Sequence, residues 1–250
     1  MPPWDMTDST LYIGCAGWNV SSGQRPLFGF GESVLQRYAT RLNAVEINSS
    51  FYRPHRQSIY QRWADTVPDT FRFSVKLPKS ITHVARLHEC EHLLSVFIGE
   101  VGGLGHKFGC LLVQLPPSLI FAPVLARTFF QTLRQVTPVP VVCEPRHPSW
   151  FTPEADGLLL EFRTGRVAAD PAVTGGAAVP GGFEETAYYR WHGSPKMYTS
   201  SYAEETLQGL VRVLQGRAVG RAWAVFDNTA SGAAVDNALM LQRLLISSPG

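Results

Sequence analysis

Stretches with the length and polarity of buried β-strands alternate with stretches of helical periodicity along the whole chain. The predicted strands cover residues 11–18, 44–52, 71–78, 108–117, 139–150, 166–170, 187–193 and 221–228. The predicted helices cover residues 33–42, 58–67, 86–99, 122–135, 153–163, 202–214 and 232–245. About eight strands alternating with about seven helices predict an α/β fold, a single TIM-like (β/α) barrel with parallel strands.

The length of 250 residues fits one such barrel, and no change in composition marks an internal boundary. We therefore expect a single domain over residues 1–250, with an N-terminal extension over 1–10 and a C-terminal tail over 246–250. Residues 171–186 are rich in Pro, Gly and Ala and have no periodicity. The helix after the sixth strand is therefore expected to be missing or reduced to a turn.

The net charge, the spacing of the cysteines and the absence of long apolar runs restrict the partners, metal sites and location expected for this chain. A net charge of +2 gives no general argument for a nucleic acid or a membrane as partner. The cysteines show no CxxC and no paired Cys/His spacing, so we expect reduced core thiols at Cys15, Cys90, Cys110 and Cys143. We also see no signal peptide and no apolar run near the roughly 18 residues of a membrane span, which predicts a soluble cytoplasmic protein.

Polar side chains gather where the predicted strands end. In 44–52, Val45 and Ile47 share one face of the strand, and Glu46 and Asn48 share the other. The outer face of a barrel strand packs on apolar helices, so the polar pair is expected to point inward. The same alternation predicts one upper barrel layer made of Glu46, Asn48, Lys76, Gln114, Glu144, Arg146, Asp170, Arg190, His192 and Asn228.

Two interpretations explain this layer. By formal count, three acidic residues balance three basic ones, so a self-paired ion network would account for the charges without any function: Glu46, Glu144, Asp170, Lys76, Arg146 and Arg190. A layer needed only for stability would use branched aliphatic side chains, because buried ion networks seldom improve on them. Ligands also bind at the carboxyl ends of barrel strands, which favours a site.

The residue types suggest roles within such a site. Arg146 and Arg190 suit the phosphate or carboxylate of a small anionic molecule, because a guanidinium binds planar oxyanions with two donors. Catalytic proton transfer is assigned to Glu46, Lys76, Glu144 and His192, although a lysine paired to Glu46 fits the sequence equally well. The other predicted substrate-binding residues are amides, one carboxylate and an aromatic wall for a sugar or base ring: Asn48, Gln114, Asp170, Asn228, Trp18, Tyr52 and Trp150.

Seven motifs carry a resemblance to a known family. In order they are YIGCAGW (12–18), VEINSSFY (45–52), FRFSVKLP (71–78), VQLPPS (113–118), EPRHPSW (144–150), RWHG (190–193) and FDNTASGAA (226–234). The chain resembles the domain of unknown function 72 family, the YecE-like proteins, over nearly its whole length. The resemblance implies a TIM-barrel-like fold and names no reaction. Pro145 and Asp227 stand where the family usually has an aromatic residue and an asparagine.

The leading hypothesis is an enzyme that acts by acid/base chemistry on a small anionic polar metabolite at the barrel mouth. One alternative is a metal-dependent hydrolase, isomerase or nuclease, with a divalent metal on Glu46, Glu144, Asp170 and His192. The other is a non-catalytic module that binds a ligand or nucleic acid. No cofactor is predicted, and a metal is less favoured because three cationic residues surround the carboxylates. No apolar stripe remains to indicate an oligomeric state.

Overall fold

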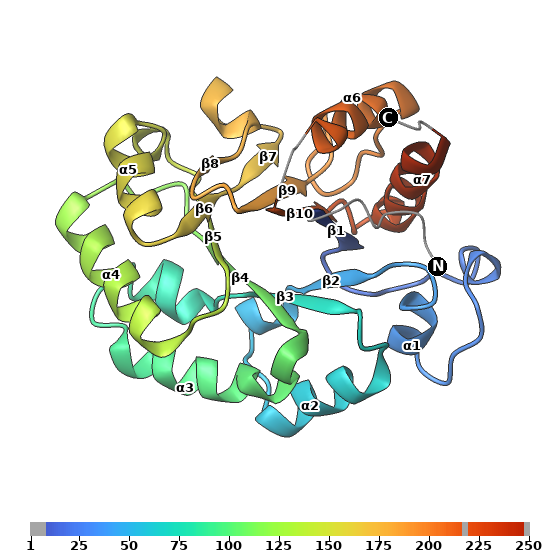
Figure 1. The fold of residues 1–250 in the computed structure, drawn as a ribbon, viewed down its shortest axis with the longest axis horizontal. Helices are drawn as coiled ribbons and strands as arrows, with labels where there is room; N and C mark the ends of the chain where they lie inside the picture. The colour runs from blue at the N-terminus through green and yellow to red at the C-terminus, as the bar shows by residue number, and fades with distance from the viewer. Residues whose placement is uncertain (1–8, 217–219, 248–250) are drawn as a thin grey trace.

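The computed structural model describes residues 9–216 and 220–247, and Figure 1 shows helices arranged around a central set of strands. The strands are β1 Ser9–Cys15, β2 Ala44–Ile47, β3 Arg72–Lys76, β4 Phe108–Gln114, β5 Val141–Glu144, β6 Thr164–Arg166, β7 Ala168–Asp170, β8 Gly181–Gly182, β9 Thr186–Trp191 and β10 Gly220–Phe226. They form two sheets, of order β1–β10–β9–β7 and β2–β3–β4–β5–β6–β8. Every described pair is parallel except β6 with β8, as expected for an α/β fold.

The two sheets are connected in two places. β6 and β7 are separated by Val167 alone, and an isolated bridge pairs Ala16, just after β1, with Glu46 of β2. The strand predicted over 166–170 is therefore divided, because β6 pairs with β5 whereas β7 pairs with β9. This division, together with the short β8, makes the described strands more numerous than the sequence predicted.

The helices are α1 Val34–Tyr38, α2 Gln57–Thr66, α3 Glu91–Val101, α4 Pro123–Val136, α5 Pro153–Glu161, α6 Glu204–Gln215 and α7 Ala233–Ser247. The predicted helix over 86–99 begins five residues late, since Arg86, Leu87 and Glu89 adopt positive φ angles that end regular helix. Between β7 and β9 the structure has only the 3-10 turn η6 Gly175–Ala178 and β8, so the helix there is reduced to a turn as expected.

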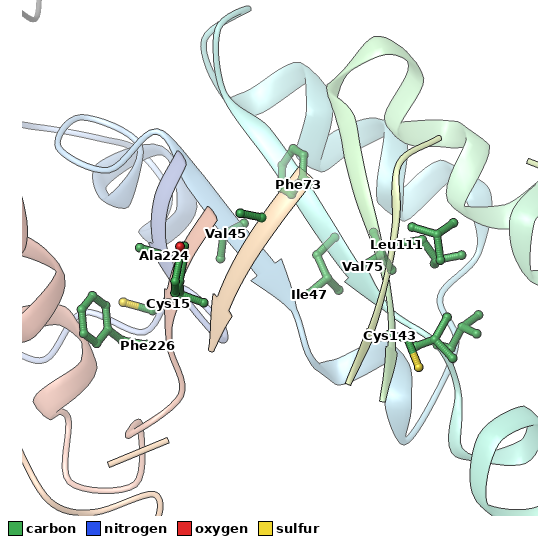
Figure 2. Close-up of a cluster of buried hydrophobic side chains, with 14 of the residues drawn as sticks. Cys15, Val45, Ile47, Phe73, Val75, Leu111, Cys143, Ala224 and Phe226 are labelled. Atoms are coloured by element: carbon green, nitrogen blue, oxygen red, sulfur yellow. The ribbon is translucent and has the colours of Figure 1, made fainter. Parts of the chain in front are cut away.

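Both faces of the strands are buried, and the alternation of side chains separates two cores. The outer core includes Val45, Ile47, Phe73 and Val75, which pack toward the helices and appear in Figure 2. The inner core includes Leu112 and Val142 and a stack of three rings, in which Trp223 lies 4.6 Å from Tyr12 and 5.8 Å from Tyr188 between ring centroids. Aromatic and aliphatic side chains thus fill the space below the strand ends.

The remaining expectations concern the termini, the thiols and membrane spans. Residues 9 and 10 belong to β1, and 246 and 247 belong to α7, so these four are not parts of terminal extensions; residues 1–8 and 248–250 lie outside the described residues. The four cysteines are buried free thiols, and burial raises the pKa of Cys15 to about 12. Within the described chain, no helix has the length and hydrophobicity required to cross a bilayer.

Candidate active site at the carboxyl ends of the strands

Arg190 of β9 is the centre of a buried ion network. Its Nη2 atom lies 2.7 Å from Glu46 of β2 and 2.9 Å from Asp227, and its Nη1 atom lies 3.2 Å from Glu144 of β5. Its Nε atom donates to Glu46 at 3.0 Å. Although burial opposes the charge, Asp227, Glu46 and Glu144 raise the pKa of Arg190 above its ordinary value. Three carboxylates therefore already contact the donors of Arg190, and its role as a ligand for an anion stays a prediction.

His192 lies between two of these carboxylates. Its Nδ1 atom is 3.0 Å from Asp227 and its Nε2 atom is 2.8 Å from Glu144, while Nη2 of Arg146 lies 2.6 Å from Nε2. A neutral ring protonated at Nδ1 can donate to Asp227 and accept from Arg146, and a neutral ring protonated at Nε2 can donate to Glu144. Each tautomer of the ring thus has an acceptor for its proton, which is the property a proton relay needs.

The neighbouring cations keep the two carboxyl groups ionised. Burial opposes ionisation of Glu144, but Arg146, Arg190 and His192 together hold the pKa of this group well below its ordinary range. The pKa of Asp227 is also lowered, since Arg190, the hydrogen bond from His192 and the charge of Lys76 outweigh burial. Neither carboxylate is suited to donate a proton near neutral pH, which argues against Glu144 as a general acid.

Glu46 is held from below by the Tyr188 hydroxyl, which also contacts Ser74. The Tyr188 hydroxyl lies 2.9 Å from Oε2 of Glu46 and 3.0 Å from Oγ of Ser74. Burial, followed by the charge of Glu46, raises the pKa of Tyr188 well above its ordinary value, so the hydroxyl stays protonated and donates. Together with Arg190, the Tyr188 hydroxyl holds both oxygens of Glu46 in place, and the catalytic role of Glu46 stays a prediction.

Lys76 differs from every other charged member of this layer. It lies at the end of β3, its residue is 6% exposed, and its Nζ atom is 4.3 Å from the centre of the Phe51 ring. Among the described residues, no carboxylate oxygen lies within 4.0 Å of Nζ. Burial and Arg190 lower the pKa of Lys76 to about 8, against the opposing charges of Glu46, Glu144 and Asp227. The structure therefore places an unpaired amine of depressed basicity at the strand ends.

Arg146 keeps one donor free. Its Nη2 atom is 2.6 Å from Oε1 of Glu144, yet its Nε atom is buried and has no hydrogen-bond partner. A buried donor without an acceptor costs roughly 1–3 kcal/mol, so it marks a place where an acceptor is expected. Of the two arginines predicted to bind an anion, only Arg146 has a donor available.

Trp18 and Asn48 lie beside this network. They line a pocket of about 420 Å³ with Gly17, Asn19 and Ser49, over the ends of β1 and β2. The Oδ1 atom of Asn48 is buried without a partner, so the pocket offers an acceptor for a ligand donor. These two predicted substrate-binding residues share a cavity next to Glu46.

Other predicted residues lie elsewhere. Asp170 accepts from the Tyr202 hydroxyl at 2.7 Å, and Asn228 donates to the carbonyl of Ser200, so both belong to the packing around the loop before α6. Trp150 is 1% exposed and donates to the carbonyl of Leu119. The sequence predicts these three residues at the barrel mouth, but alternation along a strand does not hold where the strand ends. Asp170, for example, pairs in register with Trp191, and Trp191 packs on the outer core.

The predicted aromatic wall is not formed. Tyr52 is 71% exposed and contacts the edge of Phe51, while Trp150 is buried away from the ion network. Gln114 ends β4 half-buried, level with Glu144 on β5. Trp18, by contrast, lines a pocket at the strand ends.

Sequence reasoning missed Asp227, Tyr188 and Ser74 as members of the network. The pairing of the strands places Asp227 in the network. Val225 of β10 lies opposite Arg190, so the next residue on the same face is Asp227 rather than Asn228. Tyr188 and Ser74 precede Arg190 and Lys76 by two residues on the same strands, so alternation places them on the same face. As for metals, the described residues include no group of three or more His, Cys, Asp or Glu arranged to hold an ion.

Known proteins match this chain in sequence and in fold. Residues 12–249 match the family described as protein of unknown function DUF72. UPF0759 protein YecE of Escherichia coli (strain K12) is 32% identical over 106 residues, a match covering 42% of this chain and only 38% of YecE. UPF0759 protein YunF of Bacillus subtilis (strain 168) is 24% identical over 267 residues, covering 94% of each chain. A DUF72 family protein of Thermotoga maritima superposes with a TM-score of 0.78 at 23% identity, over 94% of this chain and 99% of that one. The predicted TIM-barrel-like α/β fold is supported by this neighbour, and the chain belongs to the DUF72 family.

Proposed function

We propose that this protein is an enzyme that acts by acid/base chemistry on a small anionic polar metabolite at the mouth of a closed eight-stranded barrel. The observation that carries the proposal is Lys76. Every carboxylate of the network contacts a cation directly, whereas this buried ammonium has no carboxylate within 4.0 Å in the described chain. An ion network that served only stability would pair its third cation, because a buried charge without a partner is costly.

The contacts support a division of roles. Arg190, Glu46 and Tyr188 hold the layer rigid, since the donors and acceptors of all three are occupied. Lys76 gains or loses the proton of the substrate, because its pKa of about 8 lies near neutral pH. His192, whose ring contacts Glu144 and Asp227, relays protons to the substrate, and the free Nε atom of Arg146 binds the anionic group.

A thermal-shift screen with a library of anionic metabolites tests this proposal. The screen compares wild type with Lys76→Met and with the matched control Lys79→Met, which removes an exposed lysine three residues away. A ligand at 100 times its Kd stabilises a protein by about 2.7 kcal/mol, which raises the Tm of a chain this size by roughly 5–10 °C. We expect a metabolite to raise the Tm of wild type and Lys79→Met and not that of Lys76→Met.

Other results of the screen count against the proposal. A metabolite that stabilises Lys76→Met as strongly as wild type would show that the amine takes no part in binding. Stabilisation by a divalent cation alone would favour a metal-dependent hydrolase, isomerase or nuclease instead. Salt-dependent stabilisation by oligonucleotides alone would favour a nucleic-acid-binding module.

A further inference from the structure

The chain has only four lysines, and the structure accounts for three of them. Lys79 and Lys196 are exposed to solvent. Lys107 is buried, but its Nζ atom donates to the carbonyl oxygens of Ala64 and Val67, both at 2.8 Å. Lys76 is the exception, buried at the strand ends with neither a hydrogen bond nor an ion pair at Nζ within the part of the chain that the structure describes. Its amine is therefore free to react.

The groups around this amine have one feature in common: within the described residues, none of them forms a hydrogen bond or an ion pair with Nζ. The Phe51 ring forms an apolar floor at 4.3 Å. The charges that act on the amine come from Arg190 of β9, Glu46 of β2, Glu144 of β5 and Asp227 just after β10. The charge of Lys76 in turn acts on His83, in the helical turn Ser80–Val84.

We propose that Nζ of Lys76 forms a covalent iminium bond with the carbonyl carbon of a small substrate that also carries a carboxylate or phosphate. This inference rests on the proposed function and names its substrate class, an anionic aldehyde or ketone. A lysine needs to be neutral to attack a carbonyl carbon, and a buried amine beside a guanidinium loses its proton more readily than an exposed one.

The step balances without a further reactant. The Nζ–C bond forms, both C–O bonds of the carbonyl break, and oxygen leaves as water with two of the three protons of the original ammonium. One of these protons moves first to a carboxylate or water molecule and returns to oxygen as water departs. The product keeps one proton and one positive charge on nitrogen.

The ion network favours the iminium product because the positive charge stays on Nζ of Lys76. Glu46, Glu144 and Asp227 carry three negative charges, and Arg146 and Arg190 supply two positive ones. The iminium cation replaces the ammonium cation as the third, so the electrostatic balance of the layer is kept while the apolar floor disfavours the return of water.

The anionic end of the substrate is assigned to Arg146. The residue is 9% exposed, and its Nε atom is a buried donor without an acceptor. A carboxylate or phosphate oxygen would satisfy it and would be drawn to the guanidinium charge. Lys76 would then hold the carbonyl carbon and Arg146 the charged group.

Borohydride trapping tests the bond directly on the wild-type protein. The protein is incubated at pH 7.5 with pyruvate, with dihydroxyacetone phosphate or with uncharged hydroxyacetone, reduced with sodium borohydride, and digested for mass spectrometry. A pKa of about 8 gives Lys76 a neutral fraction about a hundred-fold above that of an ordinary lysine at this pH. We expect the adduct on Lys76 to exceed that on Lys79 and Lys196 by at least about ten-fold, allowing for limited access.

The probes separate the parts of the inference. Labelling by pyruvate alone identifies a carboxylate as the anionic group, and labelling by dihydroxyacetone phosphate alone identifies a phosphate. Arg146→Gln, checked for a cooperative melt, should lower labelling by the anionic probes at least about five-fold more than it lowers labelling by hydroxyacetone. Equal loss with all three probes would overturn the assignment of Arg146.

The bond and the proposed function can fail separately. Equal adducts on Lys76, Lys79 and Lys196, or no adduct on Lys76 with any probe, would overturn the iminium bond. If a metabolite still stabilises wild type and not Lys76→Met in the thermal-shift screen, acid/base chemistry stands without the covalent step. If no metabolite does so either, both proposals are lost.

Discussion

At the scale of single residues, Arg190 makes contacts that no other side chain could replace. Its guanidinium reaches carboxylates from three strands or strand ends, and its residue is 1% exposed. Arg190→Met would leave Glu46 buried without a cation, so the free energy of unfolding should fall by about 3–5 kcal/mol. Urea denaturation measures this change.

A matched control for this substitution lies on the surface. Arg243 pairs with Glu204 at 2.8 Å, and its side chain is 63% exposed, so Arg243→Met should cost no more than about 1 kcal/mol. Equal losses in the two variants would contradict the central position of Arg190 in the network.

Replacing Lys76 should change the free energy of unfolding in the opposite direction. Its folded-state pKa of about 8 lies below the ordinary value of 10.5, so below pH 8 the folded state must bury a charge that the unfolded state hydrates. Lys76→Met should therefore raise the free energy of unfolding by about 1–3 kcal/mol at pH 7. The advantage should shrink between pH 8 and 10.5 as the unfolded chain also loses its proton.

Urea denaturation of wild type and Lys76→Met at pH 7 and at pH 10 measures this difference. A variant that is less stable than wild type at pH 7 would show that Lys76 belongs to a self-paired network. If Lys76→Met is more stable than wild type but is no longer stabilised by metabolites, the lysine lowers the stability of the wild-type protein and is needed for binding.

At the scale of elements, one alternation rule decided how much of the site could be predicted. Residues two apart on one strand face the same way, and this placed Glu46, Lys76, Glu144 and Arg190 correctly. The rule fails where a strand ends. Beyond that point, the face on which a residue lies depends on how the strand pairs with its neighbours, and alternation along the sequence no longer predicts it. Asn228 was chosen over Asp227 for that reason.

The fold was more predictable than the contacts at the site. Parallel strands buried on both faces produce long apolar runs, and these runs mark the strands in sequence. Which carboxylate contacts which cation depends on side chains from strands far apart in sequence, such as Glu46 and Arg190. The sequence does not predict that Nζ of Lys76 lacks an ion-pair partner in the described chain, because a pairing of Lys76 with Glu46 fits the sequence equally well.

Lys107 gives a prediction for helix α2. Its Nζ atom donates to the carbonyl oxygens of Ala64 and Val67 at the end of this helix, where carbonyl groups lack partners within the helix. Lys107→Met would leave these carbonyls buried without donors and should lower the free energy of unfolding by about 1–3 kcal/mol. The control Lys196→Met, at an exposed site, should change it by less than about 0.5 kcal/mol.

Hydrogen exchange of the α2 amides distinguishes a local effect from a global one. If Lys107 acts as a C-terminal cap, exchange should accelerate most in the last turn of α2. Uniform acceleration across the protein, or none, would contradict the capping role.

At the scale of the whole molecule, the ion network joins the two sheets. Glu46 and Glu144 belong to strands of the six-stranded sheet, whereas Arg190 belongs to the four-stranded sheet and His192 follows the same strand. The pairs from Arg190 to Glu46 and Glu144, and from His192 to Glu144, therefore all cross from one sheet to the other. Within residues 9–216 and 220–247, backbone pairing between the sheets is limited to the bridge from Ala16 to Glu46, so side-chain charges carry much of this connection at the strand ends.

Acid should weaken this connection. The pKa values of Glu144 and Asp227 are lowered in the folded state, so these groups bind fewer protons there than in the unfolded chain. Their contribution to stability is complete above the ordinary carboxyl range, about pH 4–4.5, and is lost as pH falls toward their folded values. Between pH 7 and pH 2.5 the free energy of unfolding of wild type should therefore fall by about 1–2 kcal/mol more than that of Asp227→Asn, which lacks one of these carboxylates.

Urea denaturation at the two pH values measures this difference, and hydrogen exchange at pH 3 locates its origin. Because the lost ion pairs cross between the sheets, amides at the carboxyl ends of β2 and β5 should lose protection together with those at the end of β9. Loss of protection confined to one sheet would mean that the network stabilises that sheet internally. Equal acid sensitivity in wild type and Asp227→Asn would mean that other carboxylates, outside the network, control the unfolding of the protein in acid.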